Sequence, residues 1–332
     1  MLLVVGDHWT EEDEIKGEPF SGSAGKMVRS ALRHQGFNAN EVFFTCVFNR
    51  KIGDLKSQCV SRAEGIPGLP PVFPTKYCPS RFAEELTRLH KEIENVHPIT
   101  ILALGGVAAW ALLGVPGIKK IRGTPSYYVR GDRRIKVLPT YHPTAIFREY
   151  SLRPIFLADI EKLSRELAYP EIRRPSRSIW IEPSYDDLLR FEEEHILHAE
   201  RLSVDIETSG TMITCIGFAP SPSIGLVVPF TSAESPDGSY WKSHGEEVRA
   251  WRWCMKQCAR PIRKVGQNFL YDMHHLWRNY ATPMLGGNDD TMLLHHALQP
   301  EMEKGLGFLG SVYTDEAAWK FMRHRDTIKR ED

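Results

Sequence analysis

Two carboxylates in the second half of the sequence have the spacing of a metal site. Asp205 and Glu207 stand two positions apart in the stretch 203–208, which reads as a strand. The two-residue period of a strand points both side chains to one face, and carboxylate oxygens suit Mg²⁺ and Mn²⁺. The alternative interpretation is a pair of solvated acids at a sheet edge. Asn268 and Asp272 form a second pair, one turn apart on one face of a predicted helix.

The first half of the sequence carries polar residues at the ends of predicted strands. Asp7 and His8 end an apolar strand, residues 17–25 form a glycine-rich loop that enters a helix, and His142 follows another strand. Ligands of α/β folds bind at the carboxyl ends of parallel strands. We therefore expect Asp7, Phe20 and His142 to border one pocket, although a loop histidine taken alone is more often structural.

A cluster of basic residues precedes His142. Seven Lys or Arg residues and one acid, Asp132, fall between positions 119 and 136; the basic ones are Lys119, Lys120, Arg122, Arg130, Arg133, Arg134 and Lys136. Such a strip beside a pocket favours contact with phosphate groups. The alternative is a solvated hairpin. A salt-dependent affinity for DNA would distinguish the two.

The elements that must position these residues indicate an α/β protein. Predicted strands at 2–5, 42–47, 101–104 and 135–138 alternate with predicted helices at 24–34, 82–96, 107–113 and 153–169, which is typical of a largely parallel sheet. The second half continues with strands at 178–181, 203–207 and 214–219 and a helix at 186–198. The stretch 170–175, with two prolines and three charged residues, is the best linker in the chain.

Composition excludes several classes of protein. The 332 residues include 42 basic and 42 acidic side chains and 42% hydrophobic residues, which excludes a disordered, collagenous or coiled-coil chain. The apolar stretch 99–118 reads as strand, Gly-Gly turn and short helix, so we expect no membrane partner. Six cysteines without a CxxC pair, and no leader at the start, favour a reduced cytoplasmic protein.

The first half resembles the uracil-DNA glycosylase superfamily, over about residues 1–168. The resemblance rests on Gly6-Asp7, on Gly17-Glu18-Pro19-Phe20-Ser21-Gly22 and on His142-Pro143-Thr144. It implies that Phe20 stacks on a flipped base, that His142 donates a hydrogen bond to the departing uracil anion, and that Asp7 is the water-positioning acid.

Cys46 is a departure from the resembled family. It stands where relatives carry the asparagine that reads uracil, and a thiol lacks the paired donor and acceptor of an amide. We therefore expect weak or absent uracil excision. The cysteines that the iron–sulfur branch of the family requires are not matched, so we expect no iron–sulfur cluster.

The second half resembles the DEDD 3′–5′ exonucleases, especially the proofreading domain of family-A DNA polymerases, over about residues 176–320. Asp205-Ile206-Glu207-Thr208 matches their first motif, and the segment from Asn268 to Asp272 matches their second. The resemblance implies two Mg²⁺ or Mn²⁺ ions held by Asp205, Glu207 and Asp272, with Asn268 at the DNA-binding site. The third motif, Tyr or His followed four residues later by Asp, is missing from residues 290–332, because Ala317 follows Tyr313 and Ile328 follows His324 at that spacing.

These observations predict a two-domain α/β protein of phage or bacterial type. Residues 1–170 are expected to form a glycosylase-like three-layer α/β/α sandwich, 171–177 a linker, and 178–332 a ribonuclease H-like exonuclease fold. The predicted function is metal-dependent processing of DNA 3′ ends in replication or repair, in the host cytoplasm if the source is a phage. Two alternatives stay open. One is a non-catalytic DNA-binding accessory, and the other is a truncated or split part of a proofreading polymerase with a DNA polymerase subunit as partner.

Overall fold

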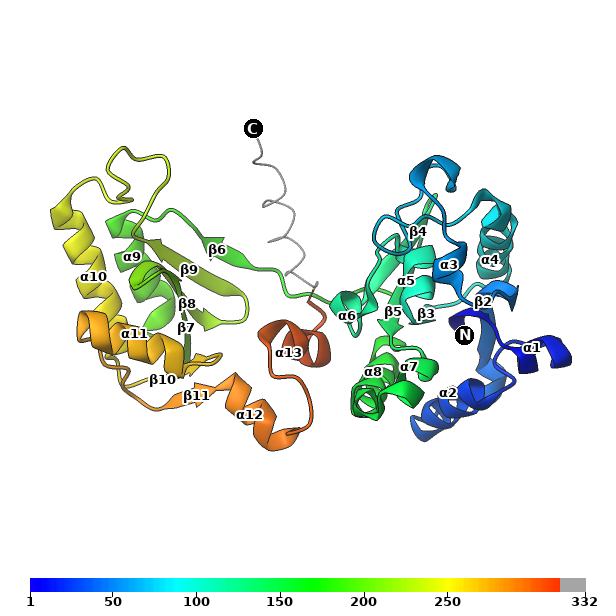
Figure 1. Cartoon of the computed structure of the whole chain (residues 1–332). Helices are drawn as coiled ribbons and strands as arrows, with labels where there is room; N and C mark the ends of the chain where they lie inside the picture. The colour runs from blue at the N-terminus through cyan, green and yellow to red at the C-terminus, as the bar shows by residue number, and fades with distance from the viewer. Residues whose placement is uncertain (317–332) are drawn as a thin grey trace. The chain divides into compact units, whose positions relative to one another are not determined.

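The computed structural model describes residues 1–316 and divides them into two units. The first unit comprises Met1–Arg174 together with residues 301–316, and the second comprises Pro175–Pro300 (Figure 1). Each unit has its own sheet and its own buried core. The predicted two-domain α/β architecture is therefore confirmed.

The first unit is built on a sheet with the strand order β2-β1-β3-β5-β4, in which only β4 is antiparallel to its neighbour. The strands are β1 (Leu2–Trp9), β2 (Val42–Lys51), β3 (Thr100–Leu104), β4 (Ser126–Arg130) and β5 (Arg133–Thr140). The helices are α1 (Glu11–Lys16), α2 (Ser23–His34), α3 (Leu55–Gln58), α4 (Ala83–Val96), α5 (Gly106–Leu113), α6 (Ile118–Ile121), α7 (Pro143–Arg148), α8 (Arg153–Glu166) and α13 (Leu306–Tyr313).

Alternation along the strands divides the first unit into three layers. Leu3 and Ile101 face one core with α4 and α5, whereas Leu2 and Leu102 face the other core with α2 and α8. β1 and β3 are buried on both faces, as parallel strands covered on both sides must be. The apolar stretch 99–118 forms β3 and α5, and no helix within residues 1–316 is long and apolar enough to cross a membrane.

The second unit contains a mixed sheet with the order β11-β10-β7-β8-β9-β6. Its strands are β6 (Ser178–Trp180), β7 (Arg201–Ser209), β8 (Met212–Ser221), β9 (Ile224–Pro229), β10 (Arg263–Gly266) and β11 (Asn288–Asp290). Its helices are α9 (Tyr185–Phe191), α10 (His244–Cys258), α11 (Leu270–Tyr280) and α12 (Thr291–Leu298). Leu202, Val204 and Ile206 of β7 pack in one core with residues of α9, α10 and α11, so the residues between them face away from the core.

Residues 301–316, which we call the return segment, differ from the sequence expectation. The predicted second domain included them, but they pack in the first unit, where α13 contacts α8. Met302 is 6% exposed and joins the core that contains Leu2 and Leu102. Burial of apolar side chains therefore places the return segment with the first unit, and the predicted continuation over 317–332 lies outside the described residues.

Candidate functional sites

A cavity of about 220 Å³ in the first unit brings together residues that are distant in the sequence. Phe20, Cys46 and His142 line it, with His8 at the end of β1 and Phe147 from α7. The turn after β1, the glycine-rich loop and the His142 loop therefore meet at one cavity. Their meeting point is the carboxyl end of the sheet, where the parallel strand order places it.

Phe20 is held in the cavity wall by a strained loop. Its φ of 59° lies in the left-handed region, which is uncommon for a residue with a side chain. The residue is 5% exposed, and the centroid of its ring lies 5.6 Å from that of Phe44 and 6.1 Å from that of His142. A Cβ atom on Gly25 would stand 1.7 Å from the Phe20 carbonyl oxygen, and one on Gly6 would stand 2.5 Å from Cζ of its ring. The two glycines therefore permit the loop to close around Phe20.

His142 is oriented as a hydrogen-bond donor. It caps the N-terminus of α7, where its Nδ1 accepts the Thr144 N–H at 3.3 Å and lies 2.8 Å from the Thr144 hydroxyl. Since Nδ1 accepts a backbone N–H, the proton of the neutral ring is on Nε2. Burial lowers the pKa of His142, opposed by the charge of Asp7, which favours this neutral form.

Asp7 lies behind the cavity rather than in its lining. Its Oδ1 accepts the N–H of Ala108 at 3.1 Å, in the first turn of α5. A Cβ atom on Gly105 would stand 2.9 Å from both Asp7 carboxylate oxygens and 3.1 Å from Cβ of His142, so the two side chains flank this glycine. Burial raises the pKa of Asp7, and His142 opposes that shift. Asp7 is therefore placed to act on His142 through charge.

Cys46 occupies the cavity as a neutral thiol. The side chain is 2% exposed, and burial raises the pKa of the thiol well above its usual range. The nearest amide on the same strand, Asn49, does not line the cavity, and its Oδ1 accepts the N–H of Cys46 and the indole N–H of Trp9, both at 3.1 Å. No side-chain amide therefore lines this cavity among the described residues.

Sequence reasoning missed an acidic rim on the same cavity. Glu11, Glu12 and Asp13 line it from the start of α1. Asp13 is buried and accepts the backbone N–H of Ser21 at 2.6 Å and that of Thr10 at 2.8 Å, so it ties the glycine-rich loop to α1. The run Thr10-Glu11-Glu12-Asp13 carries the signal of an N-terminal helix cap, which could have located this turn beside the loop.

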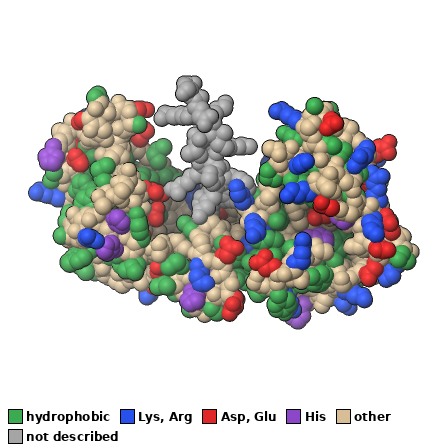
Figure 2. All heavy atoms as spheres, in the orientation of Figure 1, with side chains coloured by type: hydrophobic (Ala, Val, Ile, Leu, Met, Phe, Trp, Pro, Cys, Tyr) green, Lys and Arg blue, Asp and Glu red, His purple; other side chains and the backbone are tan. Residues whose placement is uncertain are grey.

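The predicted basic strip is divided by burial. Arg122 is 3% exposed beside Asp159, and Lys136 is fully buried with its Nζ 2.8 Å from a Glu166 carboxylate oxygen, so neither reaches a phosphate group. The phosphate role predicted for Arg122 is corrected accordingly. Figure 2 shows basic and acidic side chains interspersed on the visible face of the first unit.

The other members of the strip remain at the surface. Lys119 and Lys120 are exposed on α6. Arg134 stacks on the ring of Tyr127 at 4.6 Å, and Arg133 donates to the Glu94 carbonyl at 3.3 Å. A contact with DNA through Lys119, Lys120, Arg133 and Arg134 stays a prediction.

In the second unit, β7 and α11 bring the predicted carboxylates to one region. Asp205 and Glu207 are on the exposed face of β7, and Asp272, 3% exposed, accepts the N–H of Ile206 at 2.9 Å through its Oδ1. Burial, with Asp205 and then Asp290, raises the pKa of Asp272 to about 6. Within residues 1–316, no three Cys, His, Asp or Glu side chains are already arranged as a metal site.

Asp290 is an acid whose role sequence reasoning did not identify. It caps α12 by accepting the Met292 N–H at 2.8 Å, and it also accepts the N–H groups of Asn268 and Phe269 at 3.0 and 2.9 Å. Asn268 has a φ of 54° and an exposed side chain. Asp290 therefore fixes the left-handed turn that starts α11 and places Asp272.

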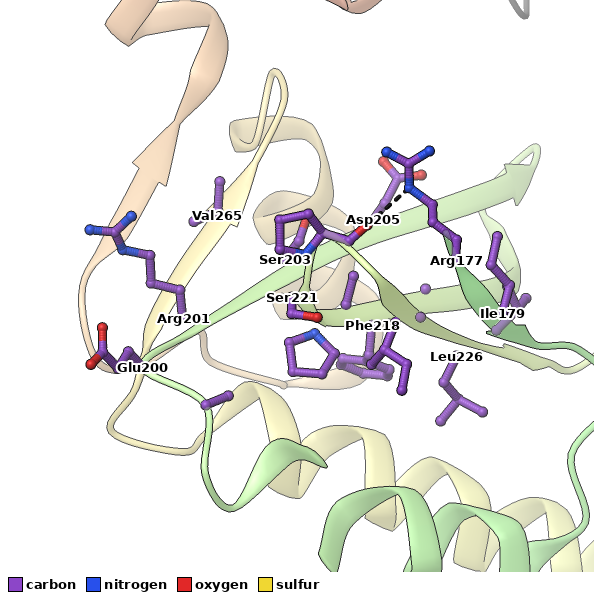
Figure 3. A pocket seen from close by; sticks show the side chains of 18 of the residues that line it. Arg177, Ile179, Glu200, Arg201, Ser203, Asp205, Phe218, Ser221, Leu226 and Val265 are labelled. Carbon is purple, nitrogen blue, oxygen red and sulfur yellow. Dashed lines mark hydrogen bonds between the residues drawn. The ribbon is translucent and has the colours of Figure 1, made fainter. Parts of the chain in front are cut away.

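A larger hollow of about 860 Å³ lies along the face of β7 that points away from the core. Ser203 and Asp205 line it together with Arg177 (Figure 3). Pro220 of β8 and Pro222, between β8 and β9, also line it. This hollow puts Asp205 on an open surface. A long substrate such as a nucleic-acid strand can therefore approach it.

A family model described as "Uracil DNA glycosylase superfamily" matches residues 2–167. The chain belongs to the uracil DNA glycosylase superfamily. The superfamily match covers every residue of the first-unit cavity and ends within the unit before the return segment.

Two relatives of this superfamily member are type-4 uracil-DNA glycosylases. The protein of Thermotoga maritima is 31% identical over 165 residues, which are 48% of this chain and 74% of the relative. That of Archaeoglobus fulgidus is 25% identical over 167 residues, 49% of this chain and 74% of the relative. The expectation of no iron–sulfur cluster stays a prediction for this superfamily member.

Solved structures similar to this superfamily member include two exonuclease domains. The EXD2 exonuclease domain soaked in Mg and dGMP is 15% identical, with a TM-score of 0.26, over 41% of this chain and 68% of its own. The EXO domain of Aedes aegypti Nibbler is 12% identical, with a TM-score of 0.34, over 46% of this chain and 76% of its own.

Proposed function

We propose that this protein processes DNA through two sites, a base-binding cavity in the first unit and a metal-dependent exonuclease-type site in the second. The setting that fits both sites is DNA repair or replication in a phage or a bacterium. The observation that carries the proposal is the cavity in which Phe20 and His142 lie side by side within the matched superfamily range.

The chemistry of the cavity suits a base that has been rotated out of the DNA stack. Cleavage of an N-glycosidic bond builds negative charge on the departing base, and an aimed donor in a dry site stabilises that charge. The Nε2–H of His142 is such a donor, because Thr144 occupies Nδ1. Phe20 provides the aromatic surface, and the carboxylate of Asp7 favours positive charge on the imidazole as negative charge develops on the base.

Uracil is not the base that the cavity reads best. Cys46 offers a weak donor and no amide pair, and a polar base edge left unpaired costs about 1 to 3 kcal/mol. We therefore expect weak uracil excision or none. The acidic rim of Glu11, Glu12 and Asp13 supplies hydrogen-bond acceptors. The pairing edge of uracil has two carbonyl oxygens, which are also acceptors, and only one N–H, so it forms few hydrogen bonds with such a rim.

The carboxylates of the second unit fit a divalent cation. The pKa of Asp272 is raised by neighbouring Asp205 after burial, and a bound cation would remove that repulsion. Asp205, Glu207 and Asp272 would hold Mg²⁺ or Mn²⁺, which would activate water and stabilise the phosphoryl transition state. The N–H of Ile206 fixes Asp272 through one of its carboxylate oxygens.

A second candidate function is non-catalytic DNA binding. Cys46 in the base-reading place and the lack of a preformed three-acid cluster within the described residues both favour it. A split or truncated proofreading polymerase, with further site residues on another polypeptide, is the third reading of the same features.

Incubation with end-labelled DNA separates these functions. The DNA is supplied with and without a single uracil, in Mg²⁺, Mn²⁺ or EDTA. Shortening from the 3′ end only when a metal is present supports the exonuclease-type site, and an alkali-sensitive abasic site supports base excision. Retention of intact DNA without either product would contradict both activities and leave the accessory function.

A further inference from the structure

The return segment is tied to the first unit by two buried cations. The first is Lys162 of α8, whose side chain is 3% exposed. Its Nζ donates to the carbonyl oxygens of Gly123 at 2.7 Å, Ser311 at 3.0 Å and Thr314. Ser311 and Thr314 lie at the C-terminal end of α13, where carbonyl groups lack helical partners and favour a cation. Lys162 therefore joins the end of α13 to the loop at Gly123.

The second cation is Arg122, which connects α13 to the sheet. Its guanidinium lies 4.7 Å from the ring centroid of Phe308 and donates to the Ser311 hydroxyl. On its other side, its Nε is 3.6 Å from a carboxylate oxygen of Asp159, and that same oxygen accepts the hydroxyl of Thr140 at 2.6 Å. Thr140 is the last residue of β5, two positions before His142.

Backbone hydrogen bonds also hold the end of β5 in place. The N–H of Gly123 donates to the Pro139 carbonyl at 2.8 Å, and the N–H of Gly105 donates to the Thr140 carbonyl at 2.9 Å. A Cβ atom on Gly123 would stand 2.8 Å from Asp159 and 3.0 Å from the Ser311 carbonyl oxygen. The end of β5 is thus enclosed by the return segment, α8 and the Gly123 turn, without space for an additional methyl group at Gly123.

We propose that the return segment is a positioning element of the first-unit cavity, and that Ser311, Arg122 and Lys162 act as positioning residues for His142. The return segment accepts hydrogen bonds from Lys162 and Arg122. Arg122 lies beside Asp159, and Asp159 accepts the hydroxyl of Thr140 at the end of the strand that leads into the His142 loop. The consequence for catalysis rests on the proposed base-binding function. The positioning itself does not, and it is measured without DNA.

The test compares two lysine substitutions on the same helix of the full chain. Ser311→Lys places a third cation beside Arg122 and Lys162, whereas Leu306→Lys places the same side chain at a position that is 46% exposed. Amide hydrogen exchange is followed in α13, in residues 139–146 and in β7, together with the NMR signals of the His142 ring. We expect Ser311→Lys to speed exchange in α13 and in residues 139–146 by about tenfold or more, and to shift the His142 signals.

A control variant and a control strand test whether the effect is specific to position 311 and to the first unit. Leu306→Lys should leave residues 139–146 and the His142 signals unchanged, and β7 should keep its protection in both variants. If Ser311→Lys unfolds the first unit, Ser311→Ala, which removes the acceptor of Arg122 and the hydroxyl that donates to the Phe308 carbonyl, should give a smaller shift in the same direction. Ser311→Thr keeps the hydroxyl and should restore the wild-type His142 signals.

Two results would overturn the proposal. One is an α13 that loses protection while residues 139–146 and the His142 ring signals stay as in the wild type. The other is an α13 that stays protected with a lysine at position 311. Because neither readout uses DNA, loss of the proposed base-binding function would leave this outcome unaffected.

Discussion

At the scale of single residues, the Cys46 thiol sets what the cavity can read. Replacing it by asparagine supplies one donor and one acceptor at the cavity wall, where the thiol is neutral and 2% exposed. We expect Cys46→Asn to raise uracil release by about tenfold or more, as expected when an unpaired polar edge gains its partners. The measurement is the rate of abasic-site formation in uracil-containing DNA.

Cys46→Ser is the matched control for that prediction. A hydroxyl is polar but cannot pair with two groups of the base edge at once, so it should give little gain. Equal rates for the wild type and Cys46→Asn, with both folded, would show that another residue reads the base. Efficient uracil release by the wild-type chain would contradict the weak excision proposed above.

Asp272 gives a prediction about stability and pH. Its pKa is raised in the folded chain to about 6, from an ordinary value of 3.8, so the folded state binds the extra proton more tightly than the unfolded state does. The associated stability is present below pH 4 and is lost as pH rises through about 6. Asp272→Asn keeps an oxygen for the Ile206 N–H and removes the charge. It should raise the free energy of unfolding of the second unit at pH 8 by about 1 to 3 kcal/mol.

Denaturant unfolding at pH 8 and pH 4 checks this prediction. The gain should be present at pH 8 and nearly absent at pH 4. Asp237→Asn removes an exposed carboxylate of the same unit whose pKa is lowered by the Ser235 hydroxyl, and it should not reproduce the gain. An equal gain at both pH values would show that packing, rather than charge, explains the effect.

At the scale of elements, the conformation of the glycine-rich loop before α2 depends on Gly25 and Gly6, because Phe20 lies where a Cβ atom on either residue would stand. Gly25→Ala would place a methyl group against the backbone of Phe20, which has a left-handed φ and cannot move without opening the cavity wall. We expect a loss of about 1 to 3 kcal/mol in the free energy of unfolding, as for other overpacked sites. Thermal unfolding of the variant measures it.

Gly17→Ala is the control for the loop. Gly17, unlike Gly25, has a positive φ, and a Cβ atom there meets nothing within 4 Å, so the cost of Gly17→Ala comes from the backbone alone. Only Gly25→Ala should also change the environment of the Phe20 ring, read from its NMR signals. Identical ring signals in both variants would contradict the assigned role of Gly25.

Most strands of the first sheet could be predicted from the sequence, whereas the burial of Arg122 could not. The apolar runs at 2–5, 101–104 and 135–138 predicted strands of the first sheet, because burial on both faces leaves an unbroken apolar pattern. The strip around Arg122 was misread, because its burial depends on Asp159, which is distant in sequence. A buried ion pair between two elements produces no periodic pattern in the sequence. The ends of the predicted strands and the order of the motifs together predicted that Phe20, Cys46 and His142 lie at one cavity.

The return segment shows a second limit of sequence reasoning. Residues 301–316 follow α12 directly and extend the exonuclease-like pattern, so sequence order assigned them to the second domain. Their placement depends on Lys162 and Arg122, two cations that precede them by more than a hundred positions. A match between carbonyl groups at a helix end and a distant lysine is not visible in hydropathy.

At the scale of the whole molecule, the separate cores predict two unfolding transitions. The first unit has two apolar clusters on either side of its sheet, and the second has its own cluster under α9, α10 and α11. Mg²⁺ or Mn²⁺ should stabilise only the transition of the second unit, because a ligand that binds the folded state shifts the equilibrium of the part that binds it. Calorimetry with each metal and with EDTA measures the two midpoints.

Asp205→Ala is the informative variant for that experiment. Asp205 is exposed on β7 and repels the Asp272 carboxylate, so its removal should keep or raise the metal-free midpoint and abolish the metal-induced shift. Glu200→Ala removes a carboxylate that lines the same hollow directly before β7 begins, and it should keep the shift. A shift that survives Asp205→Ala would place the metal elsewhere in the chain.

The position of the return segment also sets an order of events during synthesis. The ribosome completes residues 175–300 before it makes residues 301–316, an interval on the order of ten seconds at typical elongation rates. Throughout that interval Lys162 and Arg122 lack their acceptors on Ser311, and the core containing Leu2 lacks Met302. The unit that is translated first is therefore completed after the second, and the second unit has its whole core available while the first still lacks α13.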